Sequence, residues 1–94
     1  MRFTVWHAIN PTFRNFTVNG PKFPEGYKKV AVVECVSPEH VYQVTNHINS
    51  DWHDNEEVVV LFDKQSRSTS VGDIIVNPEG HIFHCEAAGW LRIG

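Results

Sequence analysis

The seven residues that begin at Arg67 form the most patterned polar stretch of the sequence, Arg-Ser-Thr-Ser-Val-Gly-Asp. Arg67 offers a planar fork of N–H donors, and the hydroxyls of Ser68 and Ser70 follow it closely in the chain. Gly72 allows an unusual backbone φ or the close approach of a ligand. These residue types predict a phosphate or carboxylate site, although the stretch lacks the length and lysine of a nucleotide P-loop. The residues alone favour a second interpretation, in which the serines bind backbone groups and Asp73 caps a turn.

Three tryptophans and a pair of lysines could complete such a site. Trp6, Trp52 and Trp90 lie off the expected core pattern, and exposed aromatic rings stack bases or anchor protein partners. Lys28 and Lys29 could supply further positive charge. Small domains also use tryptophan to close the edge of a core, so a structural role stays open for each ring. The predicted ligand-binding residues are Arg67, Ser68, Ser70, Trp6, Trp52, Trp90, Lys28 and Lys29.

The residues that could carry catalysis or bind a metal form no recognisable set. Cys35 precedes a predicted helix, where a thiolate would be stabilised, but no pattern supplies a histidine partner. His81 and Cys85 share one face of a predicted strand while His84 faces the other way, which breaks a metal triad. The acidic pair at residues 56–57 lies in a predicted acidic loop, where it is solvated. We therefore expect a protein that is not an enzyme and that holds no metal or cofactor.

The apolar pattern predicts the elements that must position these side chains. Ser37 and Pro38 are typical of a helix start, and Val41 and Val44 begin a buried stripe that continues through Thr45 and Ile48. The expected strands cover residues 3–9, 28–36, 58–62, 73–76 and 81–86, with a short final segment at residues 89–93. The run at residues 30–33 suits a central strand. We therefore expect an α+β fold, a small mostly antiparallel sheet of about five strands with one helix packed on a face, in the order β-β-α-β-β-β.

Length and composition limit the class of protein. A chain of 94 residues can form one hydrophobic core, so we expect a single domain over residues 1–94. No apolar run is long enough to cross a membrane and the first residues lack the apolar region of a signal peptide, so we expect a cytoplasmic protein without membrane association. A domain of this size gains stability by burying apolar surface in a complex, so we also expect a homo-oligomer.

Charge is distributed unevenly along the chain, whose net charge is −3. Residues 1–33 contain five Lys or Arg residues against one Glu, whereas residues 34–63 contain seven acidic residues and no Lys or Arg. The simplest interpretation of the charge pattern is that opposite charges solvate opposite faces, and the alternative is a charged binding surface.

Residues 10–26 are irregular, yet contain three Phe residues, so they form either a lid or a packed arm.

The second half of the chain resembles a known group. Residues 67–76, a short turn, an aromatic-containing strand and then Ala88-Gly89-Trp90 follow the order of the YodL-type pattern, in which Arg-Ser-x-Ser-Val-Gly-Asp precedes an apolar strand and a Gly-aromatic ending. Residues 45–52, with Asn55 and Glu56, resemble the same group. Its members are small proteins of phages, plasmids and conjugative elements. The resemblance implies a mobile-element origin and, by association with small phage proteins, a counter-defence role.

Two functional hypotheses follow. In the first, a phage-type binding protein sequesters a phosphate-bearing nucleotide signal without turnover, with Arg67, Ser68 and Ser70 holding phosphate and a tryptophan stacking the base. In the second, the acidic residues 51–57 cover a basic surface of a host defence protein or nucleic-acid-handling enzyme and inhibit it. A small nuclease that uses histidines and a structural domain in which Arg67 stabilises the hairpin are the remaining alternatives.

Overall fold

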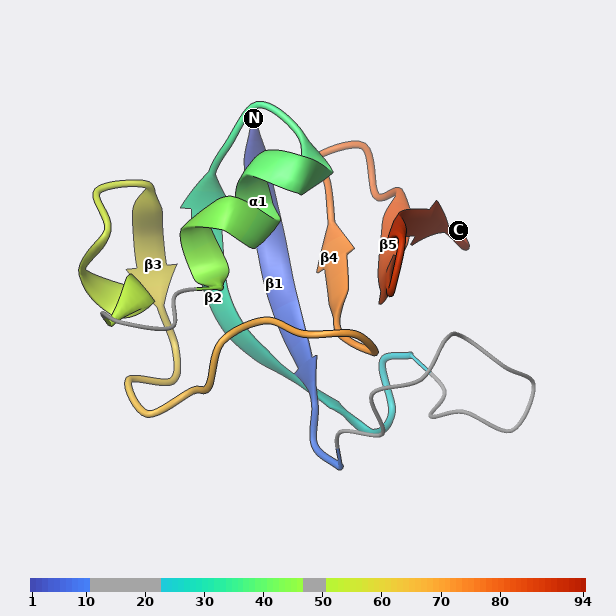
Figure 1. Ribbon diagram of the computed structural model, residues 1–94, viewed down its shortest axis with the longest axis horizontal. Helices are drawn as coiled ribbons and strands as arrows, with labels where there is room; N and C mark the ends of the chain where they lie inside the picture. The colour runs from blue at the N-terminus through green and yellow to red at the C-terminus, as the bar shows by residue number, and fades with distance from the viewer. Residues whose placement is uncertain (11–22, 47–50) are drawn as a thin grey trace.

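The computed structural model describes residues 1–10, 23–46 and 51–94 (Figure 1). The irregular segment expected at residues 10–26 lies mostly outside the described residues. Ile48, the last residue of the predicted buried stripe, also lies outside them.

Six strands form one antiparallel sheet, in the order β3-β2-β1-β4-β5-β6. The predicted α+β class and element order are therefore confirmed, and the expected short final segment is a sixth strand. The elements are β1 (Arg2–Ala8), β2 (Tyr27–Glu34), α1 (Pro38–Thr45), the short 3-10 helix η1 (Trp52–Asp54), β3 (Val58–Leu61), β4 (Ile74–Val76), β5 (Ile82–Glu86) and β6 (Gly89–Arg92).

Helix α1 begins as the sequence predicts. The Ser37 hydroxyl oxygen accepts a hydrogen bond from the backbone N–H of His40 at 3.2 Å, and Pro38 occupies the first turn, where a missing N–H costs nothing. Val41, Val44 and Thr45 are buried against the sheet. The Thr45 hydroxyl donates to the Val41 carbonyl at 2.8 Å, so this polar side chain is satisfied inside the core.

The main core lies between α1 and one face of the sheet (Figure 1). Paired residues of neighbouring strands share a face, so Val5 faces the helix together with its partners Ala31 and Ile75. All three are fully buried, and Trp52 of η1 packs into the same core. The buried run expected at residues 30–33 is confirmed except at Val32, which is only half-buried.

The sheet turns around the helix at its β5–β6 end. In Figure 1 the β5–β6 hairpin is seen nearly edge-on, to the side of α1. Contacts join α1 to β6, the edge strand, although β6 is the fourth strand from β2 in the sheet order. A second, smaller apolar cluster, built on Ala8, Tyr27 and Ile74, includes the rings of Trp6 and Phe23. Trp6 and its partner Ile74 lie on the face of the sheet opposite to α1.

Candidate functional site

Arg67, the centre of the predicted phosphate site, is bound to a carboxylate of its own chain. Its Nη1 and Nη2 atoms donate to Asp73 Oδ2 at 2.6 Å and to Asp73 Oδ1 at 2.8 Å. Asp73 is fully buried and also accepts hydrogen bonds from the backbone N–H groups of Ala8, at 2.9 Å, and Ser70, at 2.8 Å. A phosphate would have to displace a carboxylate that four donors hold. The geometry therefore corrects the predicted role of Arg67 from ligand clamp to internal ion pair.

Two oxygen atoms of the neighbouring serines accept hydrogen bonds from the Arg67 guanidinium group. Arg67 Nη1 lies 3.0 Å from the Ser68 carbonyl oxygen and 3.2 Å from the Ser70 hydroxyl oxygen. Nη2 donates to the Ala8 carbonyl at 3.2 Å, which ties the loop to the end of β1. The guanidinium group therefore joins β1, the loop and the start of β4. The residues favoured a structural role with Asp73 as a turn cap; Asp73 does accept from the Ser70 N–H, but the ion pair with Arg67 was not predicted.

A histidine completes the buried polar cluster. His7 is 1% exposed; its Nε2 atom lies 2.9 Å from the Thr69 hydroxyl and 3.8 Å from Asp73 Oδ2. Burial lowers the pKa of His7 to about 4 despite the nearby Asp73 carboxylate, so the ring is neutral at pH 7. Thr69 is fully buried, and its carbonyl accepts from Asn46 Nδ2 at 2.6 Å. Because His7, Thr69 and Asp73 are buried, we interpret the cluster as a group that stabilises the fold.

The predicted lysines and Trp6 lie elsewhere. The Lys28 ammonium group lies 2.7 Å from Asp63 Oδ2. Lys29 lies over the rings of Trp6, at 5.3 Å, and Phe62, at 5.6 Å. Since Trp6 pairs with Lys29 across β1 and β2, both side chains are on the face opposite to α1. Lys28 pairs with His7, whose ring contacts Trp52, so it lies on the helix side, whereas the sheet separates Lys29 from that side.

The other two tryptophans differ in exposure. Trp52 is 2% exposed, and its Nε1 atom donates to the Arg67 carbonyl at 3.1 Å. Trp52 therefore packs under the loop that begins at Arg67, and its buried ring cannot stack on a ligand base. Trp90 of β6 is half-buried and lines a cleft. The structure thus brings Arg67, Ser70 and Trp52 into contact in one structural cluster. Of the three predicted tryptophans, Trp90 is the one that lines a cleft.

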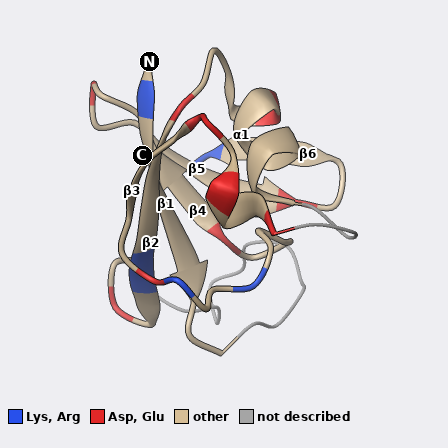
Figure 2. Ribbon diagram, turned by 90° about the vertical axis from the view of Figure 1, so that its left-hand side faces the viewer, with Lys and Arg blue, Asp and Glu red and all other residues tan. Residues whose placement is uncertain are grey.

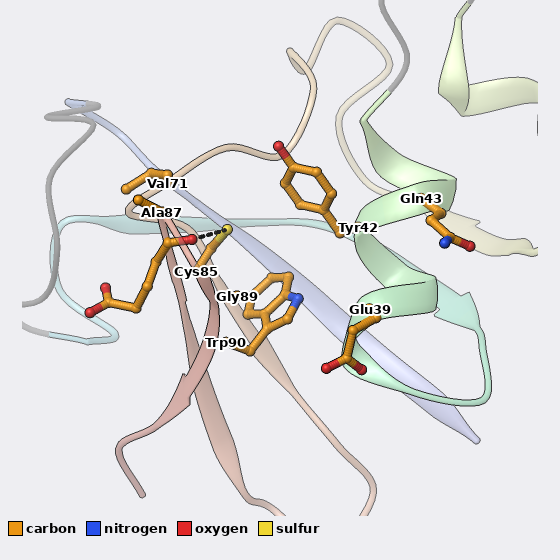
Figure 3. A pocket seen from close by; sticks show the side chains of 9 residues that line it. Glu39, Tyr42, Gln43, Val71, Cys85, Ala87, Gly89 and Trp90 are labelled. Carbon is orange, nitrogen blue, oxygen red and sulfur yellow. Dashed lines mark hydrogen bonds between the residues drawn. The ribbon is translucent and has the colours of Figure 1, made fainter.

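That cleft has a volume of about 310 Å³ and lies between α1 and the β5–β6 hairpin. Tyr42 from the helix and Trp90 from the hairpin present aromatic rings to the same space, with Glu39 beside them (Figure 3). Its size is near the lower end for small-ligand sites. The lining residues are Glu39, Tyr42, Gln43, Val71, Cys85, Glu86, Ala87, Gly89 and Trp90.

The lining of the cleft is acidic and contains no Lys or Arg among the described residues. Glu39 is exposed in the first turn of α1, whereas the Glu86 carboxylate lies 2.6 Å from the Nδ1 atom of His84, on the face of the sheet opposite to α1. Burial raises the pKa of the Cys85 thiol to about 12, which rules it out as a nucleophile near neutral pH. The arrangement suits a cationic or hydrogen-bond-donating group between two aromatic rings, and it disfavours phosphate.

A second, polar cleft of about 250 Å³ lies along α1, lined by His40, Gln43, Val44, Asn55 and Glu57. The acidic residues 51–57 border it. Asn55 Nδ2 donates to the Val44 carbonyl at 2.8 Å, and Glu57 lies 3.9 Å from His40 Nε2. The helix is therefore flanked on two sides by clefts that contain glutamates.

A serine, a histidine and an aspartate also lie close together in this region. His53 Nε2 lies 2.8 Å from the Ser66 hydroxyl and His53 Nδ1 lies 2.5 Å from Asp51 Oδ1. The distances resemble those of a nucleophilic relay, but His53 Nδ1 makes no hydrogen bond within the described residues, and the Ser66 hydroxyl donates its proton to the Asp63 carbonyl at 2.9 Å. His53 then acts as a donor to Ser66 and cannot remove its proton. Because Ser66 is also only 8% exposed, we interpret this group as a loop brace.

Comparisons with known proteins identify no relative: no family model, curated protein or solved structure matches this chain. The YodL-type resemblance, the mobile-element origin, the cytoplasmic location and the homo-oligomer therefore stay predictions. In the described part of the chain, no helix is long and apolar enough to span a membrane. Within the same residues no three His, Cys, Asp or Glu side chains gather as a metal site.

Sequence reasoning missed Tyr42 and Glu39 as candidate binding residues. Tyr42 had a signal, because it is an aromatic residue of α1 outside the buried stripe and is 38% exposed. Trp90 follows a two-residue turn between Glu86 and Gly89. Nothing in the local sequence indicates that this hairpin comes round to the helix.

Proposed function

We propose that the protein acts by binding, without catalysis, and that the acidic surface around α1 occupies a basic surface of a protein partner. This is the inhibitor hypothesis of the sequence, extended from one loop to the whole helix side. The observation that carries it is the gathering of carboxylates around α1. They are Glu39, Asp51, Asp54, Glu56 and Glu57.

Contacts within the chain support this gathering. The loop that carries Asp54 and Glu56 is held to the helix, because Asn55 bonds to the Val44 carbonyl and η1 contacts α1. Figure 2 marks acidic residues on α1 and on segments near it. Lys29 lies on the opposite face of the sheet, with Trp6. A surface of one charge sign steers a partner of the opposite sign and fixes its orientation.

The class of partner follows from this charge. Proteins that handle nucleic acids carry basic surfaces that hold phosphates, and clustered carboxylates can occupy such a surface in their place. The resemblance of residues 67–90 to mobile-element proteins makes a host defence protein the first partner to test. The nucleotide-sequestering hypothesis finds less support, since Arg67, Lys28 and Lys29 are engaged within the chain and none of them lines a described cleft.

Titration with two defined probes tests the proposal. A deca-arginine peptide and a panel of mono-, di- and cyclic nucleotides would each be added to the protein, with binding followed by calorimetry at two ionic strengths. We expect salt-sensitive binding of the peptide and no binding of the nucleotides. Glu56→Lys should weaken peptide binding about five- to tenfold, whereas Glu25→Lys, an exposed reversal outside the helix side, should not. Nucleotide binding without peptide binding, or equal effects of the two reversals, would refute it.

A further inference from the structure

The cleft between α1 and the β5–β6 hairpin has features that a merely acidic surface does not need. Its two aromatic rings come from different elements, Tyr42 from the helix and Trp90 from the edge strand (Figure 3). The Tyr42 hydroxyl accepts from Asn46 Nδ2 at 3.1 Å, which holds the ring in place from the next turn of the chain. Trp90 packs against the main core with part of its ring exposed. Both rings are therefore positioned before any ligand arrives.

The charge of the cleft selects the kind of group that fits between these rings. Among the described lining residues, Glu39 is the one whose charged side chain belongs to the helix side; Glu86 lines the cleft next to Cys85, but its carboxylate lies 2.6 Å from His84 Nδ1 on the other face of the sheet. A guanidinium or ammonium group is attracted both to carboxylates and to the faces of aromatic rings, and the attraction grows as water is displaced. An Arg or Lys side chain satisfies both parts of this lining, whereas an acidic or phosphorylated group satisfies neither.

Among the described strands β6 is the outermost, and its outer edge runs beside the cleft. The turn between Glu86 and Gly89 contains two residues, so Glu86 and Gly89 form a hydrogen-bonded pair. Along an antiparallel pair of strands, hydrogen-bonded pairs alternate with pairs that are not hydrogen-bonded. The next hydrogen-bonded pair is therefore Leu91 with His84, and the hydrogen bond from the Ile93 N–H to the Ile82 carbonyl at 2.8 Å confirms this alternation. The backbone N–H and C=O groups of the intervening Trp90 and Arg92 point outward.

These outward groups can bind an extended peptide. A strand added to β6 would hydrogen-bond to Trp90 and Arg92, and the peptide residue opposite Trp90 would project to the same face of the sheet as the Trp90 ring. That face is the helix side, because Trp90 pairs with Cys85 and both line the cleft. The outward backbone groups of β6 and the cleft are therefore placed so that one extended segment can contact both.

We infer that β6 and the adjoining cleft bind an extended segment of the partner, with one Arg or Lys side chain of that segment between Tyr42 and Trp90. The inference rests on the proposed binding of a basic partner, and it names the place and the conformation of the bound segment. Backbone pairing supplies general affinity, and the cation in the cleft fixes the position of the segment along the edge.

NMR titration of the full chain with the acetylated, amidated peptide Thr-Val-Arg-Val-Thr tests the inference. We expect shifts of the Trp90 and Arg92 amides, and binding weaker by about three- to fivefold when citrulline replaces the peptide arginine. Tyr42→Ala should weaken binding by a similar factor without unfolding, since Tyr42 is 38% exposed. Leu91→Ala is the matched control, because Leu91 lies on the opposite face of the same strand.

The two proposals fail in different ways. If Glu56→Lys weakens deca-arginine binding but Tyr42→Ala and citrulline have no effect on the short peptide, the acidic surface stands and the cleft site is refuted. If the short peptide shifts β6 and depends on its arginine while Glu56→Lys changes nothing, the cleft stands and the wider surface is refuted. Shifts of the Trp90 and Arg92 amides with protein concentration alone would assign this edge to a second copy of the chain and overturn the inference.

Discussion

Replacing Arg67 with methionine would test whether this residue stabilises the fold or binds a ligand. The change keeps an apolar stem of similar length and removes the guanidinium group, and Asp73 keeps only its backbone donors from Ala8 and Ser70. Asp73 is fully buried and Arg67 is one-third exposed, so the loss leaves an unpaired charge in the interior. Breaking a buried pair from one side costs about 3 to 5 kcal/mol, and the partial exposure of Arg67 favours the lower end.

A loss of about 3 kcal/mol is a large part of the stability of such a chain, which at 94 residues is about 5 to 14 kcal/mol. The expected decrease in melting temperature is about 12 to 24 °C. Urea denaturation followed by tryptophan fluorescence is a suitable assay, because Trp52 is buried and bonds to the Arg67 carbonyl. Lys29→Met is the control, since this exposed cation contacts only aromatic rings on the far face in the described residues and should change stability by less than about 1 kcal/mol.

The paired variant sharpens the test. Asp73→Asn in the Arg67→Met background removes the unpaired charge, so it should recover part of the lost stability, and the two changes should be non-additive. If Arg67→Met melted within about 4 °C of the wild type, the internal ion pair would not stabilise the fold. Arg67 would then return as a candidate for anion binding.

Three further predictions follow from buried groups and from one turn. The pKa of His7 is about 4 in the folded protein against 6.5 for unfolded histidine, so the unfolded state takes up the proton first and stability falls as the pH decreases through this window. Urea titrations at pH 7.5 and 4.5 should show a loss of about 2.5 kcal/mol from this group, and the loss should disappear in His7→Gln. Burial raises the pKa of Cys35 to about 11 and of Cys85 to about 12, so both thiols should resist Ellman's reagent until urea is added; rapid labelling of the native protein would contradict this. Gly72 has a φ of +100° and no atom within 4 Å of an added Cβ, so Gly72→Ala should cost about 1 to 2 kcal/mol through backbone strain alone, while an unchanged unfolding midpoint would show that the turn relaxes.

Local signals allowed the start of the helix to be predicted, because capping depends on neighbours in sequence. Ser37 and Pro38 act within one turn, and the contacts that they make are the ones that the pattern implies. The strand positions were also predictable from apolar runs. The strand order was not, because β1 takes β4 as a neighbour across more than sixty residues of intervening chain, and no turn signal encodes that pairing.

The role of Arg67 shows the limit for the candidate site. The sequence supplied both the cation and its partner Asp73, six residues apart, but only the fold decides that the carboxylate turns inward to meet it. Trp52 likewise follows no apolar run, and its burial depends on the gap that α1 leaves over the sheet. The cleft itself requires that β6 come round to the helix, so Tyr42 and Trp90 meet only in the finished structure.

The central position of β1 has a consequence for synthesis on the ribosome. β1 is made first, yet its neighbour β4 is separated from it by about 65 residues of chain. At about 5 to 20 residues per second, one edge of β1 stays unpaired for about 3 to 13 seconds before the sheet can close. During that interval the chain is a substrate for chaperones that recognise extended apolar segments. We therefore expect the yield of folded protein in cells to depend on chaperone supply more strongly than its final stability would suggest.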